Sequence, residues 1–371
     1  MKQLSRTFAT EKQNKLSKNT TETANMKRFC LSIFNFRLSQ QTKMKLMLFM
    51  ACLMACPCMT LHAEEDDDEE KAEGQVIIKL MGDFHTGFGS KNKERGFDIE
   101  ANQLGYEYEF KNGFSAKAVL YVGKAADNSG SQRVVYIKQA FATWEKNDFT
   151  LKVGIIPTRQ FRYQEKFWGH RYIMKSFQDE YKFGSSADLG LSVDYEFADW
   201  ISADATIVNG EGYKKLQINA GLNYGIGITL TPVKGLKFRL YGGINESGEE
   251  GKKNITNLAA FAGYNHKKFD VGAEYNYMTN ASYKDNADRY GYSVYGSVKL
   301  SKIVSLYARF DDLYSKSDWN IANDESTAML GTQIKIGKYV KVAPNVRMNM
   351  PKEPGGKTTY SAFLNYYLNI D

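Results

Sequence analysis

The 371-residue sequence has little cysteine and little proline, and it has no apolar run long enough to cross a membrane as a helix. Its four cysteines all lie within the first 58 residues, so a chain processed beyond that point has no disulfide, no cysteine-bound zinc and no thiol nucleophile. Six prolines and the lack of low-complexity tracts argue against a mostly disordered chain. What is abundant is aromatic residues and glycine, a mixture typical of many β-strands.

The positive charge is unevenly distributed, which weakens a nucleic-acid interpretation. The formal charge of +7 comes from 49 Lys+Arg against 42 Asp+Glu. Residues 1–63 hold ten basic and two acidic residues, whereas residues 64–73 hold eight acidic residues and one basic residue. From Gly74 onward 38 basic residues face 32 acidic ones, a moderate excess of +6. We therefore expect no nucleic-acid partner.

An apolar segment near the start has the features of a secretory signal peptide. Lys45 precedes about 14 apolar residues, and the small residue Ala63 stands before an acidic stretch. This order of charged, apolar and small residues predicts a signal peptide over residues 44–63, cleaved after Ala63. Alternatively, Leu53-Met54-Ala55-Cys56 resembles a lipoprotein cleavage box, which would leave Cys56 acylated.

The segments on either side of the signal peptide are not expected to belong to the fold. Residues 1–43 are polar and weakly patterned, so we interpret them as an over-extended N-terminus with Met44, or alternatively Met26, as the initiator. An unusually long charged region before the signal core is the other interpretation. Residues 64–74 are interpreted as an acidic, solvated tail.

From Gln75 onward, apolar and polar residues alternate in segments separated by turn residues, which predicts β-strands. One face of the clearest segments is apolar, as in Leu189, Leu191, Val193, Tyr195 and Phe197. Another segment is predicted to run from Gln217 to Leu230, with Ile218, Ala220 and Leu222 on its apolar face. Strands of about 9–11 residues with this pattern are typical of transmembrane barrels, whereas soluble proteins usually have strands of about 5–6 residues.

Short and long connections alternate strictly along this region. Short ones are predicted at 111–113, 146–148, 198–199, 231–235, 266–268, 301–302 and 337–338, and long ones at 87–95, 124–130, 159–185, 209–216, 245–253, 279–287, 315–324 and 351–357. Short turns on one side and long loops on the other are characteristic of membrane barrels. We therefore expect residues 75–371 to form an all-β, transmembrane, antiparallel up-and-down β-barrel of sixteen strands, with both chain ends on the side of the short turns.

Some details of this barrel are less regular. Fourteen or eighteen strands also fit the pattern, and residues 131–145 and 254–265 can be phased either way. The apolar residues of the second strand change phase near Asn102-Gln103, which predicts a bulge there. Pro344 is the one proline that would interrupt a strand.

The connection 159–185 is the longest, and it is rich in aromatic and basic residues. Loops of this length are usually functional, and its aromatic side chains would be unfavourable in water. We expect it to fold into the lumen and narrow a pore; a loop lying over the mouth, or packing at a subunit contact, is the alternative. Its candidate constriction residues are Arg159, Arg162, Glu165, Lys166, Trp168, His170, Arg171, Lys175, Asp179 and Glu180.

Sixteen strands, eight outer loops, a long third loop and no plug domain make residues 75–371 similar to the Gram-negative general and phosphate-selective porins. The resemblance lies in architecture more than in sequence motifs. It implies an outer-membrane channel for passive diffusion of small hydrophilic solutes and ions, periplasmic termini and a homotrimer whose third loops line the constrictions. Porins often end in an aromatic residue, whereas this chain ends in Leu368-Asn369-Ile370-Asp371.

Phosphate-selective porins carry a ladder of arginines and a lysine cluster in the lumen. The inward basic candidates here are Lys237, Arg239, Arg309, Lys335, Lys341 and Arg347. Inward acids accompany them, namely Asp194, Glu196, Asp204, Asp270, Glu274 and Asp311. The basic set and the loop's net +3 predict a weak preference for anions, phosphate among them. Alternatively, the lumen charges pair with each other and only keep the pore wet.

No catalytic, metal or cofactor site can be assembled from the sequence. The histidines after residue 63 are His85, His170 and His266, and their spacing matches no ligand pattern. We expect no enzymatic activity and no cofactor. Two other functions remain in competition: a channel specific for sugars or peptides, and a non-channel barrel that serves as an enzyme or adhesin. In the first, sugar rings would stack on Phe161, Tyr163, Phe167, Trp168 and Tyr172.

Mass spectrometry of the mature protein tests the predicted processing. If residues 44–63 are a signal peptide, the N-terminal peptide begins at Glu64 and carries no cysteine. A mature chain that begins at an acylated Cys56 would contradict cleavage after Ala63.

Overall fold

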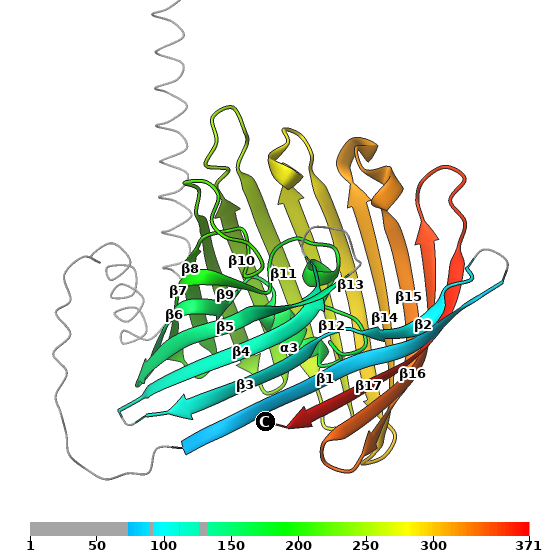
Figure 1. Ribbon diagram of the computed structural model, residues 1–371, viewed down its shortest axis with the longest axis horizontal. Helices are drawn as coiled ribbons and strands as arrows, with labels where there is room; N and C mark the ends of the chain where they lie inside the picture. Colours follow the sequence, from blue (N-terminus) through cyan, green and yellow to red (C-terminus); the bar gives the residue numbers. More distant parts are fainter. Residues whose placement is uncertain (1–72, 90–91, 111, 126–131, 371) are drawn as a thin grey trace, which may run out of the picture. The chain divides into compact units, whose positions relative to one another are not determined.

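The computed structural model describes residues 73–89, 92–110, 112–125 and 132–370, most of which lie in β-strands (Figure 1). The predicted segments 1–43 and 44–63, and residues 64–72 of the predicted tail, lie outside the described residues. The first strand begins at Glu73, two residues earlier than the predicted start at Gln75. Among the described residues, no helix has the length and apolar character needed to cross a bilayer.

The described residues contain seventeen strands and five short helices. The strands are β1 (Glu73–Phe88), β2 (Arg95–Ile99), β3 (Asn102–Glu109), β4 (Phe114–Lys124), β5 (Arg133–Lys146), β6 (Phe149–Pro157), β7 (Ala187–Ala198), β8 (Ile201–Val208), β9 (Asn223–Val233), β10 (Leu236–Asn245), β11 (Ile255–Asn265), β12 (Phe269–Thr279), β13 (Arg289–Lys299), β14 (Val304–Ser315), β15 (Glu325–Ile336), β16 (Val340–Pro351) and β17 (Thr359–Ile370). The helices are α3 (Arg162–Trp168), α4 (Phe177–Glu180), η1 (Ala281–Tyr283), η2 (Lys316–Asp318) and η3 (Ile321–Asn323).

These strands form a closed antiparallel barrel. Successive strands pair from β3 to β17, and β17 pairs with β1 from Ile78↔Ile370 to Phe88↔Tyr360, which closes the sheet. Because β2 and β3 both pair with β1 and occupy one strand position, the barrel has sixteen positions, and the predicted fold is confirmed. The short turns lie at the same end as the start of β1 and the end of β17 (Figure 1).

The interruption between β2 and β3 is the bulge that the sequence predicts near Asn102. The backbone amides of Glu100 and Ala101 both donate to the carbonyl of Met81, at 2.9 and 3.4 Å. Two residues therefore oppose one on β1, and the register shifts by one residue between Gly82↔Ile99 and Lys79↔Gln103. This shift returns the apolar residues of β3 to the outer face.

A second bulge explains why residues 131–145 can be phased either way. The pairing of β4 with β5 passes from Val119↔Gln139 to Leu120↔Ile137, so Lys138 is the extra residue. The bulge turns Lys138 toward the ring of Tyr121, and its side chain is only 6% exposed. Pro344 does not break its strand, since β16 is continuous and Pro344 pairs with Leu364 of β17, but the ladder between β15 and β16 lacks the pairs at Ala343 and Pro344.

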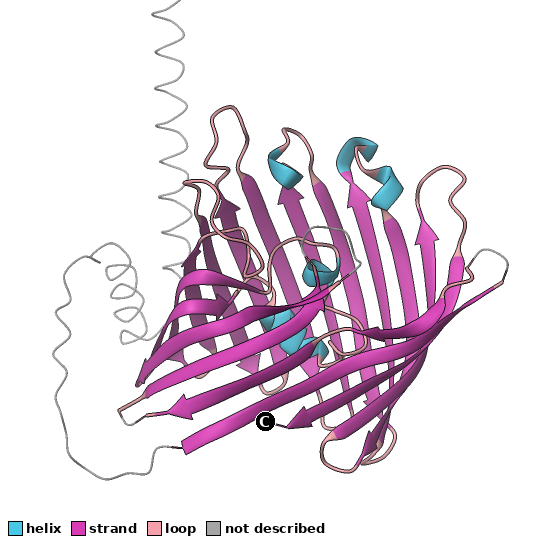
Figure 2. Cartoon of the chain, in the orientation of Figure 1, coloured by secondary structure: helices cyan, strands magenta, loops and turns pink. Residues whose placement is uncertain are grey.

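The outer face of the barrel is apolar over its whole circumference. Large side chains that alternate along the strands are exposed there, as in Tyr224, Ile226 and Ile228 of β9 or Leu240 of β10, which is 63% exposed. Such a continuous belt is unfavourable in water and needs an apolar environment. Figure 2 shows that helix is confined to the loops and to the interior of the barrel.

The strand predicted to start at Gln217 starts instead at Asn223, so the prediction for 217–222 is wrong. The side-chain oxygen of Asn219 accepts a hydrogen bond from the amide of Gly221 at 2.8 Å, a turn that bends the chain. The residue predicted on the apolar face there, Ile218, is 78% exposed, and its neighbour Leu216 is 85% exposed. The loop between β8 and β9 is therefore 209–222, longer than the alternating pattern indicates.

Replacing Gly154 by alanine should destabilise the barrel. Gly154 has φ +124° within β6, and an added Cβ would run into the carbonyl oxygen of Ala140. Strain of this kind costs about 1–3 kcal/mol. The folded and unfolded forms are separated by gel electrophoresis of samples heated to increasing temperatures. The band of the folded form should disappear at a lower temperature for Gly154→Ala than for the wild type. Gly242→Ala is the matched control, since its Cβ meets only Leu258 at 3.6 Å; equal behaviour of the two variants would contradict the assigned strain.

Candidate functional site

The loop 158–186, which joins β6 to β7, lies inside the barrel, as predicted for residues 159–185. Its apolar side chains are buried against the inner wall, among them Phe161, Trp168, Tyr172, Ile173, Phe177 and Phe183. Figure 1 shows α3 within the ring of strands. We call residues 158–186 the constriction loop.

The sequence of α3 explains how the constriction loop meets the wall. Gln164 and Trp168 are four residues apart, so they share one face of the helix, and both are buried. Lys166 lies on another face and is exposed. The helix ends at Gly169, which has φ +67° and donates its amide to the carbonyl of Glu165 at 3.1 Å. A left-handed residue at this point favours glycine.

Aromatic rings join the constriction loop to several strands. Phe167 packs edge-on against Phe261 of β11 with ring centroids 5.0 Å apart, and Trp168 packs against Tyr295 of β13 at 5.1 Å. Tyr172 stacks on Tyr367 of β17 at 5.2 Å. The loop therefore follows the inner wall from β11 to β17.

Arginines from the wall bind the loop backbone. Arg239 of β10 donates to the carbonyl of Arg159 at 2.8 Å, Arg309 of β14 to that of Lys175 at 2.5 Å, and Arg347 of β16 to that of Ile173 at 2.6 Å. Arg289 of β13 donates to the carbonyls of Tyr181 and Lys182. These charge-assisted bonds satisfy buried carbonyls that no secondary structure pairs.

The same arginines are neutralised or stacked on the wall side. Arg239 binds Asp204 at 2.6 and 3.0 Å, and Arg309 binds Asp311 at 2.8 and 2.6 Å in a bidentate pair. Arg347 lies over the ring of Phe363, 3.7 Å from its centroid. Arg239 and Arg309 are each only 3% exposed. They are covered by the loop.

The charges on the constriction loop itself are largely paired. Arg171 binds Glu165 at 3.2 Å and Asp179 at 3.3 Å, while Arg162 lies 3.4 Å from Glu165. Arg159 pairs with Asp194 of β7. Most loop carboxylates are therefore compensated by arginine, whereas among the described residues no carboxylate lies within ion-pair distance of Lys166 or Lys175.

Burial and neighbouring charges shift the pKa values of three groups of the constriction loop. It lowers the pKa of His170 to about 4, an effect that nearby Lys341 reinforces, so this histidine is neutral at neutral pH. Burial raises the pKa of Glu180 above its usual value. Burial also opposes the charge of Lys175, but Glu180, Asp179 and Glu100 outweigh it and raise the pKa of Lys175. The lysine therefore stays charged inside the barrel.

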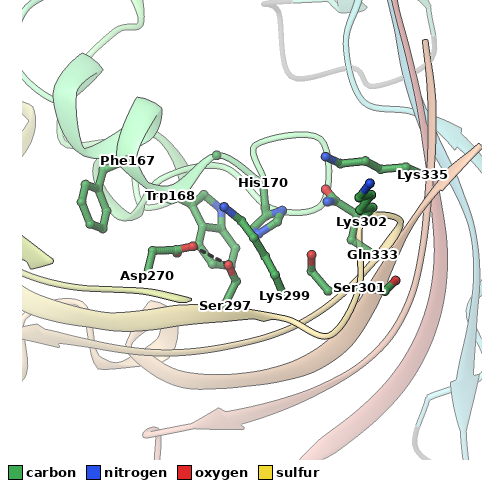
Figure 3. A pocket seen from close by; sticks show the side chains of 12 residues that line it. Phe167, Trp168, His170, Asp270, Ser297, Lys299, Ser301, Lys302, Gln333 and Lys335 are labelled. Carbon is green, nitrogen blue, oxygen red and sulfur yellow. Dashed lines mark hydrogen bonds between the residues drawn. The ribbon is translucent and has the colours of Figure 1, made fainter. Parts of the chain in front are cut away.

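A pocket of about 300 Å³ lies between the constriction loop and the short-turn end of the wall. Figure 3 shows Lys299, Lys302 and Lys335 around it together with His170. Asp270 also lines it and accepts a hydrogen bond from Ser297 at 2.5 Å. Among the described residues, none of these three lysines has a carboxylate within ion-pair distance. The pocket therefore has an excess of positive charge.

The structure divides the predicted wall residues into three groups. Arg239, Arg309 and Arg347 hold the loop, and Lys335 lines the basic pocket. Lys237 lies over the ring of Tyr163 at 5.8 Å, and Lys341 over the ring of Tyr367 at 5.5 Å.

Several residues at the site are absent from the predicted set, namely Lys138, Arg289, Lys299 and Lys302. Arg289, Lys299 and Lys302 lie at strand ends or in turns, where alternation gives no direction. Lys138 is missed because the bulge changes the alternation at this position, so the sequence pattern does not place its side chain on the inner face.

Comparison with known proteins identifies similar structures but no similar sequence. No protein-family profile and no curated protein sequence matches the chain. OprB of Pseudomonas putida matches with a TM-score of 0.62 and 10% identity, over 80% of this chain and 94% of that one. OmpF of Salmonella typhi matches with 0.61 and 11%, over 80% and 97%. An anion-selective porin from Comamonas acidovorans matches with 0.60 and 11%, over 81% and 100%. The chain therefore has the fold of the bacterial outer-membrane porins.

Arg309→Met should lower stability by about 3–5 kcal/mol, because it leaves the buried carboxylate of Asp311 unpaired. The double variant Arg309→Met/Asp311→Asn should recover much of the loss, since neither charge of the pair remains. Both should expose the constriction loop to protease, because the carbonyl of Lys175 loses its donor. Urea unfolding in detergent and limited proteolysis measure these effects. A single variant as stable as the wild type would contradict the assigned pairing.

Proposed function

We propose that the protein is an outer-membrane channel for passive diffusion of small hydrophilic solutes and ions. One observation carries this proposal: a polar loop is held inside a closed sixteen-strand barrel whose outer face is a continuous apolar belt. A barrel of this size is wide enough for an aqueous lumen, and a loop fixed within it narrows that lumen. The apolar belt fits a lipid bilayer.

The location and assembly belong to the same proposal. The fold shared with outer-membrane porins supports a Gram-negative outer membrane. The short turns and both described chain ends share one end of the barrel, and short turns face the periplasm in such barrels. We infer periplasmic termini on this basis, and a homotrimer from the likeness to porins.

The proposed selectivity is a weak preference for anions. Acids near the loop are paired with arginines, as in Arg171 with Glu165 and Asp179, and Arg159 with Asp194. The lysines of the basic pocket have no such partners among the described residues. Unpaired charge close to the path biases which ions enter. The structurally similar Comamonas porin is described as anion-selective, which agrees with this proposal.

A sugar-specific channel is less well supported. The aromatic residues that would form a stacking path include Phe161, Trp168 and Tyr172, and all three are buried between the loop and the wall. The ring of Trp168 packs edge-on against Tyr295, and that of Tyr172 stacks on Tyr367. A non-channel barrel that acts as an enzyme or adhesin gains no specific support from the described residues, and we expect no catalytic activity.

Planar-bilayer recording tests the proposal directly. The wild-type protein should give stepwise conductance, and its reversal potential in a salt gradient should show mild anion preference. Reversing Lys299, Lys302 and Lys335 to glutamate should shift the reversal potential toward cation preference, because three positive charges near the path become negative.

The matched control is Lys252→Glu, since Lys252 lies in an outer loop and pairs with Glu249 at 2.6 Å. It should leave the reversal potential nearly unchanged. A wild-type protein that never conducts would refute the channel, whereas clear cation preference in the wild type would refute only the selectivity. Liposome swelling with sugars of graded size should then show a cut-off by size rather than by identity.

A further inference from the structure

We propose that the loop 209–222 is a second constriction element, and that Tyr213 and Lys214 are size- and charge-determining residues of the channel. This inference rests on the proposed channel function and adds a loop that the sequence pattern assigned in part to a strand. We call residues 209–222 the second lumen loop.

The base of the second lumen loop is fixed to the barrel wall. Asp188 at the start of β7 accepts hydrogen bonds from the amides of Gly210 and Gly212, at 2.7 and 3.1 Å. The amide of Tyr213 donates to the carbonyl of Ala187 at 3.0 Å. Gly212 has φ +83°, which turns the chain inward beside Ser185 of the constriction loop. The two loops therefore touch at their bases.

The side chains that follow this turn lie inside the barrel. The ring of Tyr213 meets the rings of Tyr121 and Tyr136 edge-on, with centroids 6.0 and 6.1 Å apart. Tyr121 and Tyr136 face each other across β4 and β5 on the inner side of the sheet. The ammonium group of Lys214 lies over both rings, at 5.5 and 5.0 Å from their centroids. A loop between β8 and β9 thus reaches across to β4 and β5.

A gap in the barrel wall explains why the second lumen loop reaches there. Within the described residues, β6 pairs with β5 only from Ala140 to Lys146, so residues 133–139 of β5 have no partner on β6. The gap arises because the chain leaves the wall after Pro157 to form the constriction loop. Lys214 donates to the carbonyl of Lys124 at 3.4 Å, at the upper end of the same sheet segment. The second lumen loop covers this gap from inside.

Positive charge accumulates where the two loops meet. Lys138 lies 5.0 Å over the ring of Tyr121 and 5.8 Å over that of Tyr213. Arg171 of the constriction loop has its acidic partners on one side, and its Nη1 is buried without a hydrogen-bond partner among the described residues. Burial lowers the pKa of Lys214, and Lys175 of the constriction loop lowers it further, which indicates that the two loops act on each other electrostatically.

Steric and electrostatic consequences follow for the channel. Tyr213 occupies lumen space next to Tyr121 and Tyr136, so it limits the size of a passing solute. Lys214 adds charge beside Lys138 and Arg171, so it favours small anions such as chloride, phosphate and short carboxylates. The tyrosine rings hold Lys138 and Lys214 by cation–π contact, and among the described residues no carboxylate lies within ion-pair distance of either lysine.

Two substitutions with neighbouring controls test this role in bilayers. Tyr213→Ala should raise single-channel conductance, whereas Ile218→Ala, in the same loop but exposed, should not. Lys214→Glu should shift the reversal potential toward cations, whereas Lys215→Glu, an equal charge change at an exposed position, should shift it less. If wild type conducts but each variant behaves like its control, the second constriction is refuted and the channel stands.

A readout without ion flow separates this inference from the channel itself. The sequence has no cysteine after residue 58, so a single introduced thiol is unique in that part of the chain. In Tyr213→Cys the thiol should react slowly with a bulky water-soluble maleimide, because the reagent must enter the lumen that the two loops narrow. In Ile218→Cys it should react fast. Equal rates would refute the placement of Tyr213 in a narrowed lumen, whether or not the protein conducts.

Discussion

The structure depends on one constraint: the backbone of a loop that enters a barrel must find hydrogen-bond partners there. A strand obtains them from its neighbours, but the constriction loop has only short helices and leaves many carbonyls free. Arg239, Arg289, Arg309 and Arg347 supply the donors, and Asp204 and Asp311 balance two of these charges inside the wall. Basic residues that the sequence suggests as determinants of ion selectivity therefore hold the loop against the wall.

This constraint divides the charges of the lumen between two tasks. Most of the arginines bind carboxylates or loop carbonyls, because the planar guanidinium group can donate several hydrogen bonds at once. The lysines are left facing open volume, as at Lys299, Lys302 and Lys335. A mixed lumen can therefore carry a net bias, since the two kinds of base do not contribute equally to the field along the path.

The sequence predicted the barrel well because successive side chains of a strand point to opposite faces of the sheet, so each residue type indicates which face it occupies. Strand number, alternation of turns and loops, the bulge at Glu100–Ala101 and the inward loop all follow from period-two patterns and turn residues. The sequence-based prediction was wrong or incomplete where side chains interact across the barrel. The turn at Asn219 ends the strand pattern although apolar and polar residues continue to alternate in the sequence. The bulge at Lys138 changes which face of the sheet its side chain occupies, and alternation alone does not show this. The carbonyl that Arg309 binds belongs to a distant loop, so the sequence pattern does not identify it.

The order along the chain of the arginines that hold the loop has a consequence for assembly. The constriction loop ends at residue 186, whereas all four arginines that hold it come later, from Arg239 to Arg347. The sheet also closes only when β17 reaches β1. The loop can therefore be seated only after the last third of the chain has arrived, which makes a seated loop a marker of a completely assembled barrel.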